Sequence, residues 1–352
     1  MITDTFPAVK LKLSQLLQYR DNFLRSIADK RKETIGTYER ALREFVQFFA
    51  KDGKFMFRVR DVERYRKHLA ETKKMKDASI ATYMTSLRRF CQYLVETEVL
   101  EKNPAKRVYG SARPKSHNRT FLTLDELKVL LDSIDAEEES GLRDIAIIRL
   151  MLGCACSEVE IAAMDWGDLE GRGSSWNLIV QGKGRSIKDE RIPVPPETAT
   201  AVLAYRATQT RLDDDRKKVY PASDAPMFLS YSNRSMGGRI TIRGVREAIM
   251  RRLKDSGVQK GRAGRLTPFS LRHTAGILMV ESGASVEELM QRMRIVWRPT
   301  AMLYFKQKGK LRSSNDDESR AMISLEKPRA GRKSAERGSG SGEKDDTKLA
   351  TR

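Results

Sequence analysis

The residues of this sequence that could do chemistry together are an arginine and, about thirty residues later, a tyrosine. Arg272 is followed at once by His273, and both lie with Tyr304 in the stretch from Leu266 to Phe305. An arginine binds a phosphate through two parallel hydrogen bonds, and a tyrosine oxygen can attack one as a nucleophile. The pairing indicates covalent chemistry on a phosphate group, if the fold brings the two side chains together.

The charge of the whole chain indicates a polyanionic partner. Its 352 residues carry a net charge of +20, with 32% charged residues and a pI near 9.9. Nucleic acid is the first candidate and an anionic membrane the second, and a generally basic surface is the alternative to both. A membrane partner is disfavoured because no apolar run is long enough to span a bilayer and no signal peptide opens the chain. We expect a cytoplasmic, nucleoid-associated protein.

Cysteine and histidine are too few and too scattered to predict a disulfide framework or a metal site. The cysteines are Cys91, Cys154 and Cys156. The histidines are His68, His117 and His273. The cysteine count is odd, no Cys/His cluster exists, and two of the cysteines stand in an apolar stretch that favours core packing. We expect no metal and no cofactor.

Residues 13–101, after a lead-in at residues 1–12, predict a compact helical domain. Four runs show apolar residues at helical spacing: 13–28, 33–53, 59–74 and 79–100. Lysines and arginines recur between the apolar positions, so we expect the domain to lie against a DNA backbone. A solvated charged surface is the alternative for any single residue. The expected DNA contacts here are Arg31, Arg43, Arg88 and Arg89.

Residues 102–119 predict a basic linker between two domains. The segment contains Pro, Gly and Ser with six Lys or Arg and no Asp or Glu. Such a charge indicates that the linker runs beside phosphates. The expected DNA contacts in it are Lys106, Arg107, Arg113 and Lys115.

Residues 120–315 predict a second, mixed α+β domain with a small antiparallel sheet. Helical patterns alternate with one stretch, residues 176–195, that alternates like two strands around Gly182-Lys183-Gly184. A short strand and a polar loop are expected at 226–238. A basic amphipathic helix at 240–257 carries two further expected DNA contacts, Arg243 and Arg246.

Helix ends in this domain are marked by local signals. Thr123-x-x-Glu126 and Ser285-x-x-Glu288 are capping boxes in front of apolar runs. Pro299 favours the start of a short last helix that carries Tyr304. The chain from 316 to 352 is a C-terminal segment, and its composition predicts disorder after about residue 326.

Three patterns in this order resemble the tyrosine recombinase, or phage integrase, family. The stretch from Ser157 to Leu169, with its Trp-x-Asp ending, resembles the first box of the family. Gly182 to Val194 resembles the hairpin that carries the active-site lysine, and Leu271-Arg272-His273-Thr274 with Tyr304 resembles the second box and the nucleophile. The resemblance implies a mainly α fold, with a SAM-like four-helix core-binding domain followed by a recombinase catalytic domain.

The resemblance also implies a reaction. Tyr304 would attack a DNA phosphate, leaving a 3′-phosphotyrosine link and a free 5′-hydroxyl without metal or ATP. Lys183 would give a proton to the leaving oxygen, and Arg272 would hold the charge on the non-bridging oxygens. His273 and Trp297 are possible supporting residues.

Three expected site positions depart from the family. Ser157 stands where the first box supplies a second arginine, Phe269 where a His or Lys is usual, and Ile295 where a His or Trp is usual. Trp297, two positions after Ile295, would replace it only with a shifted turn. Three cations could in principle supply the missing charge: Arg149, Arg185 and Lys188.

Three functions are therefore open. The first is an active recombinase or integrase that works as a homotetramer on two duplexes, with accessory recombination proteins and with residues 319–325 as a helix that docks on a neighbouring subunit. The second is a weak or inactive recombinase-fold protein that binds DNA as an accessory subunit or regulator of a mobile element. The third is a generic basic scaffold for RNA or chromatin, which the ordered matches disfavour.

Overall fold

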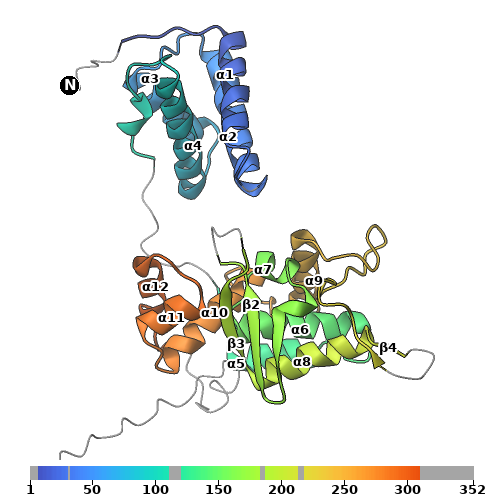
Figure 1. The fold of residues 1–352 in the computed structure, drawn as a ribbon. Coiled ribbons are helices and arrows are strands. Elements are labelled where there is room, and N and C mark those ends of the chain that lie inside the picture. Colours follow the sequence, from blue (N-terminus) through green and yellow to red (C-terminus); the bar gives the residue numbers. More distant parts are fainter. Residues whose placement is uncertain (1–6, 31, 111–119, 183–186, 213–217, 310–352) are drawn as a thin grey trace, which may run out of the picture. The chain divides into compact units, whose positions relative to one another are not determined.

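The computed structural model describes residues 7–30, 32–110, 120–182, 187–212 and 218–309. Contacts divide the chain into two compact units, Met1–Lys115 and Ser116–Arg352, and each is described by itself (Figure 1). Several predictions fall outside the described residues. These are Arg31, Arg113, Lys115, Lys183, Arg185, the helix at 319–325 and the C-terminal segment from 316 to 352.

The first unit contains the four predicted helices. Its elements are α1 (Leu13–Ser26), α2 (Lys32–Asp52), α3 (Val59–Lys67), a π-helical turn η1 (His68–Thr72), α4 (Asp77–Glu96) and a 3-10 turn η2 (Pro104–Lys106). One predicted helix, 59–74, is thus broken, because its second half winds as a π-helix. Phe45 lies at the centre of the core, with the rings of Phe55 and Tyr65 both 5.2 Å away in edge-on contact. These buried aromatic rings hold the helices together.

The second unit is helical around a small sheet. Its helices are α5 (Leu124–Asp132), α6 (Glu139–Gly153), α7 (Glu158–Ala162), the 3-10 turn η3 (Trp166–Asp168), α8 (Pro196–Thr208), α9 (Ile242–Asp255), α10 (Pro268–Glu281), α11 (Val286–Arg292) and α12 (Arg298–Phe305). α10 is the most buried of them and packs against α6, while α11 and α12 gather beside it (Figure 1). The predicted capping boxes at Thr123 and Ser285 are confirmed, since each side chain binds the backbone N–H three residues on.

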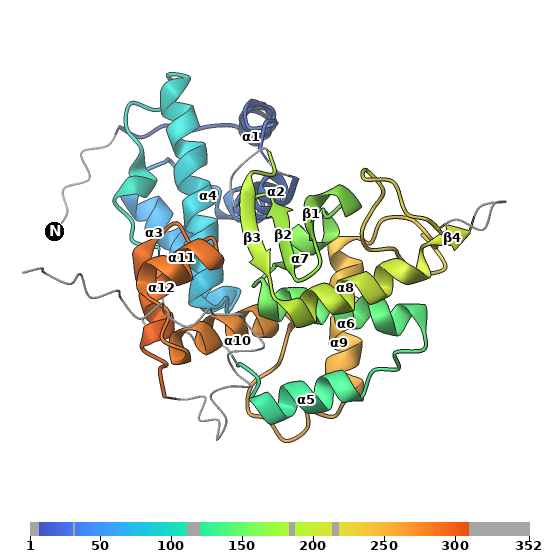
Figure 2. The ribbon, with the colours of Figure 1, turned by 60° about the horizontal axis from the view of Figure 1, so that its bottom comes forward.

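The sheet has three antiparallel strands in the order β1-β2-β3. They are β1 (Leu169–Arg172), β2 (Ser175–Val180) and β3 (Glu190–Val194), with Leu178 paired to both Leu169 and Ile192. The hairpin of β2 and β3 is the predicted one, and β1 is an additional strand. α8 lies along α6 and reaches the sheet at β2 (Figure 2).

Other local predictions in this unit were wrong in detail. α8 ends at Thr208 and is followed by a two-stranded ribbon that the helical pattern did not predict, β4 (Arg211–Leu212) with β5 (Lys218–Val219). The strand expected near residue 226 is reduced to isolated bridges, Asp165 with Pro226 and Leu229 with Arg239. The three cysteines are buried free thiols, which confirms the core packing predicted for Cys154 and Cys156. Among the residues that the structure describes, no helix is long and apolar enough to cross a membrane.

Candidate active site

Tyr304 and the Arg272-His273 step come together on α10 and α12. The ring of Tyr304 packs against the ring of His273, with 5.0 Å between their centroids, and only 2% of Tyr304 is exposed. Gly276 makes this approach possible, because a Cβ at that position would lie 2.5 Å from Cε1 of Tyr304. The predicted nucleophile is therefore buried against α10.

Arg272 joins two turns of the domain that are distant in sequence. Its Nη1 donates to the carbonyl of Ala155 at 2.5 Å and to Oε2 of Glu160 at 3.0 Å, both near the start of α7. Its Nη2 donates to the carbonyl of Met293 at 2.5 Å, at the end of α11. Burial and the nearby charge of a second arginine lower the pKa of Arg272, while Glu160 and Tyr304 oppose that shift. An arginine nevertheless stays charged in proteins, so the site contains a fixed cation within electrostatic reach of Tyr304.

Ser157, at the position where the family has an arginine, serves as the N-cap of α7. Its hydroxyl donates to Oε2 of Glu160 at 2.8 Å and accepts from the backbone N–H of Glu160 at 3.4 Å. Its own backbone N–H donates to the same carboxylate oxygen at 2.6 Å. The hydroxyl of Ser157 is thus engaged in capping a helix.

The second arginine of the site is Arg294, in the turn between α11 and α12. Its side chain is 3% exposed and makes five hydrogen bonds. Nε donates to Oε1 of Glu160 at 2.5 Å, and Nη2 donates to Oε2 of Glu160 at 3.0 Å and to the carbonyl of Ala155 at 2.7 Å. Nη1 donates to the carbonyls of Cys154 at 3.2 Å and Arg292 at 2.6 Å. A guanidinium has five N–H donors, so all of them are used inside the protein.

Glu160 is the carboxylate on which both arginines converge. Burial alone would raise its pKa, but the charges of Arg294 and Arg272 outweigh burial and lower it. The same carboxylate, against the cost of burial, raises the pKa of Arg294. All three groups are therefore charged together near neutral pH, two cations with one anion.

Two residues of this cluster hold backbone conformations that side chains other than glycine rarely adopt. The φ angles are +47° at Ala155 and +52° at Arg294, both in the left-handed region. Such conformations persist where the surrounding contacts determine them. Here the carbonyl of Ala155 is bound by the side chain of Arg294, so the two strained turns hold each other.

The other expected site positions lie as follows. Phe269 is half-buried on α10, and Ile295 packs partly against the core. Trp297 is 54% exposed at the start of α12, so the turn is not shifted in a way that buries it beside Tyr304. Two cations considered as replacements for the lost arginine are engaged elsewhere, Lys188 with Asp165 and Asp168, and Arg149 with Glu197. Sequence reasoning missed Arg294, which reaches the site from a turn that no local pattern marked.

The described basic residues expected to contact DNA differ in how exposed they are. Arg43, Arg89, Lys106 and Arg107 are exposed on the first unit. Arg88 instead binds its own domain, donating to the carbonyls of Ala105 and Val108. On α9, Arg243 pairs with Glu247 and Arg246 with Glu158 while both remain exposed. The start of α9 borders an open polar cavity of about 880 Å³, where Arg143, Arg234, Arg243 and Arg251 face the single carboxylate of Glu247.

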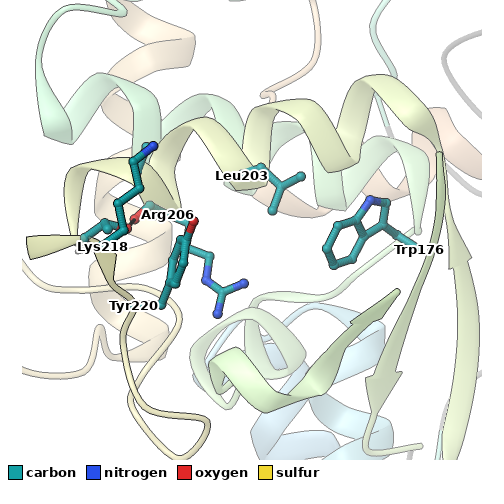
Figure 3. Close-up of a pocket in the computed structure, with 7 residues that line it drawn as sticks. Trp176, Leu203, Arg206, Lys218 and Tyr220 are labelled. Atoms are coloured by element: carbon teal, nitrogen blue, oxygen red, sulfur yellow. Dashed lines mark hydrogen bonds between the residues drawn. The ribbon is translucent and has the colours of Figure 1, made fainter. Parts of the chain in front are cut away.

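A separate cavity lies between α8 and the hairpin (Figure 3). It has a volume of about 440 Å³, and Trp176 faces Arg206 and Tyr220 across it. The guanidinium of Arg206 stacks 5.1 Å from the ring centroid of Tyr220 and 5.2 Å from that of Trp166. None of the residues of the Tyr304 site line this cavity, so it is not the centre of the chemistry.

Comparison with known families agrees with this arrangement. The sequence profile of the phage integrase family matches residues 120–305, more than half of the chain, and that of the phage integrase N-terminal SAM-like domain matches residues 21–98. The chain belongs to the phage integrase family. Among curated proteins, this family member is similar to the tyrosine recombinase XerC of Escherichia coli O127:H6 (strain E2348/69 / EPEC), with 28% identity over 264 residues, 73% of this chain and 80% of XerC.

Solved structures show the same fold. A lambda integrase dimer bound to a COC′ core site has a TM-score of 0.61 at 14% identity, covering 89% of this chain and 81% of that chain. The Tn1549 transposon integrase in complex with transposon right end DNA has a TM-score of 0.60 at 16% identity, covering 87% of this chain and 97% of that one. The predicted fold class, a SAM-like helical domain followed by a recombinase catalytic domain, is confirmed.

Proposed function

We propose that this phage integrase family member is an active site-specific DNA recombinase that cleaves and rejoins strands through Tyr304. The observation that carries the proposal is the buried cluster of Arg272, Arg294 and Glu160 beside Tyr304. Two cations and one anion leave one net positive charge in a place screened from water, where charge acts strongly. A buried cation near a tyrosine is suited to binding a phosphodiester that the tyrosine attacks.

In the proposed reaction the hydroxyl oxygen of Tyr304 attacks the phosphorus of the scissile phosphodiester. A bond forms between the tyrosine oxygen and phosphorus while the phenolic proton of Tyr304 passes to water. The bond to the 5′-oxygen breaks, and Lys183 supplies the proton of the leaving 5′-hydroxyl. Arg272 stabilises the negative charge that gathers on the non-bridging oxygens, an effect of preorganised donors that typically contributes about 10²–10³ in rate. His273, whose ring packs on that of Tyr304, supports the nucleophile. Attack by a 5′-hydroxyl on the phosphotyrosine reverses the step and rejoins DNA.

The proposed substrate is duplex DNA bound by both domains. The exposed cations Arg43 and Arg89 of the helical domain and Arg243 and Arg246 of α9 would contact phosphates, which fix position without reading sequence. The solved relatives include XerH bound to its difH substrate and the DNA-bound integrase dimer described above. By analogy we propose that this protein also works as an oligomer on DNA, a tetramer on two duplexes.

A covalent trapping experiment tests the proposal. The full chain is incubated with a pool of nicked duplexes of randomised sequence, denatured with SDS, and examined for DNA that stays attached to protein. We expect an adduct that disappears in Tyr304→Phe and enriches one sequence on repeated selection. DNA that binds tightly and salt-sensitively but never becomes covalent would overturn the proposed catalysis.

The alternative is a DNA-binding accessory protein that has kept the fold without the reaction. Tyr304 is 2% exposed, and Arg272 donates to the carbonyls of Ala155 and Met293, so nucleophile and cation both face inward. Phe269 and Ile295 are apolar where the family has proton-handling groups. The trapping experiment separates the two functions, because only the recombinase forms the adduct.

A further inference from the structure

The site keeps two arginines although its first box has lost one. In the family pattern that box supplies an arginine where this chain has Ser157. In this structure Arg294 brings a guanidinium to the same turn, bound to the carbonyls of Cys154 and Ala155 and to Glu160. The charge lost at one turn is thus present again, carried by the turn that faces it.

The hydrogen bonds of the two arginines overlap in an informative way. Nη1 of Arg272 has two acceptors, the carbonyl of Ala155 and Oε2 of Glu160. Nη2 of Arg294 binds the same two atoms. If Arg272 turned toward a phosphate, both of these buried acceptors would keep a donor, because Arg294 still binds them. A buried acceptor without a donor would cost about 1–3 kcal/mol.

We infer that Arg294 is a positioning residue that replaces the positive charge of the missing first-box arginine. It reaches the site from the turn that faces the first box. It holds Glu160 and the turn before α7 in place, and it gives the buried cluster its net positive charge. It thereby leaves Arg272 free to bind the phosphate. All five donors of Arg294 are used within the protein, so it acts through Arg272 and does not itself touch the phosphate. This inference rests on the proposed function, since it assigns a residue to that site.

Arg294→Gly is the variant of choice because it removes the guanidinium and suits the backbone. Glycine adopts a φ of +52° without strain, so the substitution leaves the turn its conformation. The double variant Ser157→Arg/Arg294→Gly moves the arginine to the position that the family uses. The matched control is Arg298→Ala, four residues on at the start of α12, whose side chain is 59% exposed and pairs on the surface with Glu287.

The first measurement needs no DNA and uses tungstate, a tetrahedral anion shaped like phosphate. Calorimetric titration of the wild type and of Arg272→Ala gives the part of tungstate binding that depends on Arg272. We expect Arg294→Gly to weaken that part by about tenfold or more, the double variant to restore most of it, and Arg298→Ala to leave it unchanged. Equal Arg272-dependent binding in wild type and Arg294→Gly would overturn the inference, and so would the lack of any such binding in the wild type.

The second measurement is the rate of adduct formation on the DNA selected by trapping, well below the unfolding temperature of each variant. We expect a loss of about 10²–10³ in Arg294→Gly and recovery in the double variant. A wild type without adduct, but with tungstate binding that follows Arg294, would sink the proposed catalysis and leave the role of Arg294 standing. An adduct that forms equally fast in Arg294→Gly and in the wild type would support the proposed catalysis and overturn the role of Arg294.

A purely structural role for Arg294 predicts another pattern. The loss of rate and of tungstate binding would then follow the loss of thermal stability in every variant. Arg294→Lys distinguishes the two, because lysine keeps the charge but has only three donors for the five bonds. Tungstate binding retained in Arg294→Lys despite a lowered unfolding temperature supports the electrostatic role, and loss of both in proportion contradicts it.

Discussion

Two turns of the catalytic domain meet at Glu160, and they contribute opposite things. The turn between α6 and α7, residues 154–157, offers acceptors, namely the backbone carbonyls of Cys154 and Ala155, and leads into α7 with the carboxylate of Glu160. The turn between α11 and α12, residues 293–297, offers a donor, Arg294, whose Nε binds Oε1 of Glu160. Each turn contains one strained residue, and the strain is held by the contact with the other turn.

The difference shows that the cation of the candidate site can come from a different segment of the chain, as long as its side chain reaches the same place in the fold. The first turn has Ser157 where the resemblance implies an arginine, and it presents two buried carbonyls as acceptors. The second turn supplies the cation that those acceptors need, since a buried carboxylate and buried carbonyls require donors. The two turns should therefore behave as one energetic unit, and variants of either turn should disturb the other.

The largest effect is expected from Glu160→Ala. The substitution leaves Arg272 and Arg294 buried beside each other without their shared anion, and breaking a buried ion pair costs about 3–5 kcal/mol. Urea unfolding of wild type and variant gives the difference directly. Glu170→Ala removes an exposed pair with Arg191 and is the control that should leave the midpoint in place. A Glu160→Ala midpoint as little changed as the control would show that the two turns are independent.

The charge-dependent part of that loss should appear as a pH dependence. The pKa of Glu160 is lowered in the folded protein from the usual 4.5, because the two arginines outweigh burial. A carboxylate with a lowered folded pKa contributes stability that is present above its unfolded pKa and is lost as the pH falls through the folded one. We expect the gap in unfolding free energy between wild type and Glu160→Gln to close as the pH falls below 4.5. A gap that stays constant would mean that charge does not link the turns.

Gly276→Ala should disturb the turn at residues 293–297 through contacts from α10. Its Cβ would lie 2.5 Å from Cε1 of Tyr304 and 2.6 Å from Sδ of Met293, so α12 and the end of α11 must shift. Overpacking of this kind costs about 1–3 kcal/mol. Thermal unfolding measures it, with Gly36→Ala on α2 as the control, because nothing lies within 4 Å of a Cβ there. A variant of Gly276 as stable as that of Gly36 would show that Tyr304 is not fixed against α10.

Much of the fold is predictable from sequence because its signals are local. The capping boxes at Thr123 and Ser285 and the helical runs of the first unit depend on neighbours within a few residues. β1 was missed because only Leu169 of its four residues is buried, which leaves no alternating pattern. The π-helical turn at residues 68–72 has no local signature in the run that it ends.

The candidate site is less predictable because its bonds are long-range. Arg272 and Tyr304 could be proposed from their types and spacing. Arg294 could not, because its bonds to Glu160 and Ala155 join residues 134 and 139 positions apart. Its left-handed backbone is also one that local preference would not give an arginine. The available hint was chemical: a family position that has lost its arginine predicts a replacement cation somewhere in space.

A smaller effect is expected from Ser157→Ala in the first turn. The variant loses the N-cap of α7, at a cost of about 1 kcal/mol. Glu160 keeps its bonds to Arg272 and Arg294 and to the backbone N–H of residue 157, so the ion pairs remain. Thermal unfolding should show a modest loss of stability. The dissociation constant for tungstate should stay within about twofold of that of the wild type. A loss of tungstate binding as large as that of Arg294→Gly would give Ser157 the direct role on phosphate that its capping bonds argue against.

The smallest effect is expected from Arg298→Ala, four residues after Arg294. Arg294 and Arg298 each pair with a glutamate, Glu160 and Glu287. The side chains of Arg298 and Glu287 are both mostly exposed, whereas those of Arg294 and Glu160 are buried. Water screens an exposed pair and hydrates each charge when its partner is removed. The buried carboxylate of Glu160 would not be hydrated in this way if Arg294 were removed. A double-mutant cycle on each pair isolates the interaction from the effects of truncation. We expect strong coupling between Arg294 and Glu160 and none measurable between Arg298 and Glu287. Equal coupling in the two pairs would mean that burial is not what makes the contact between the turns matter.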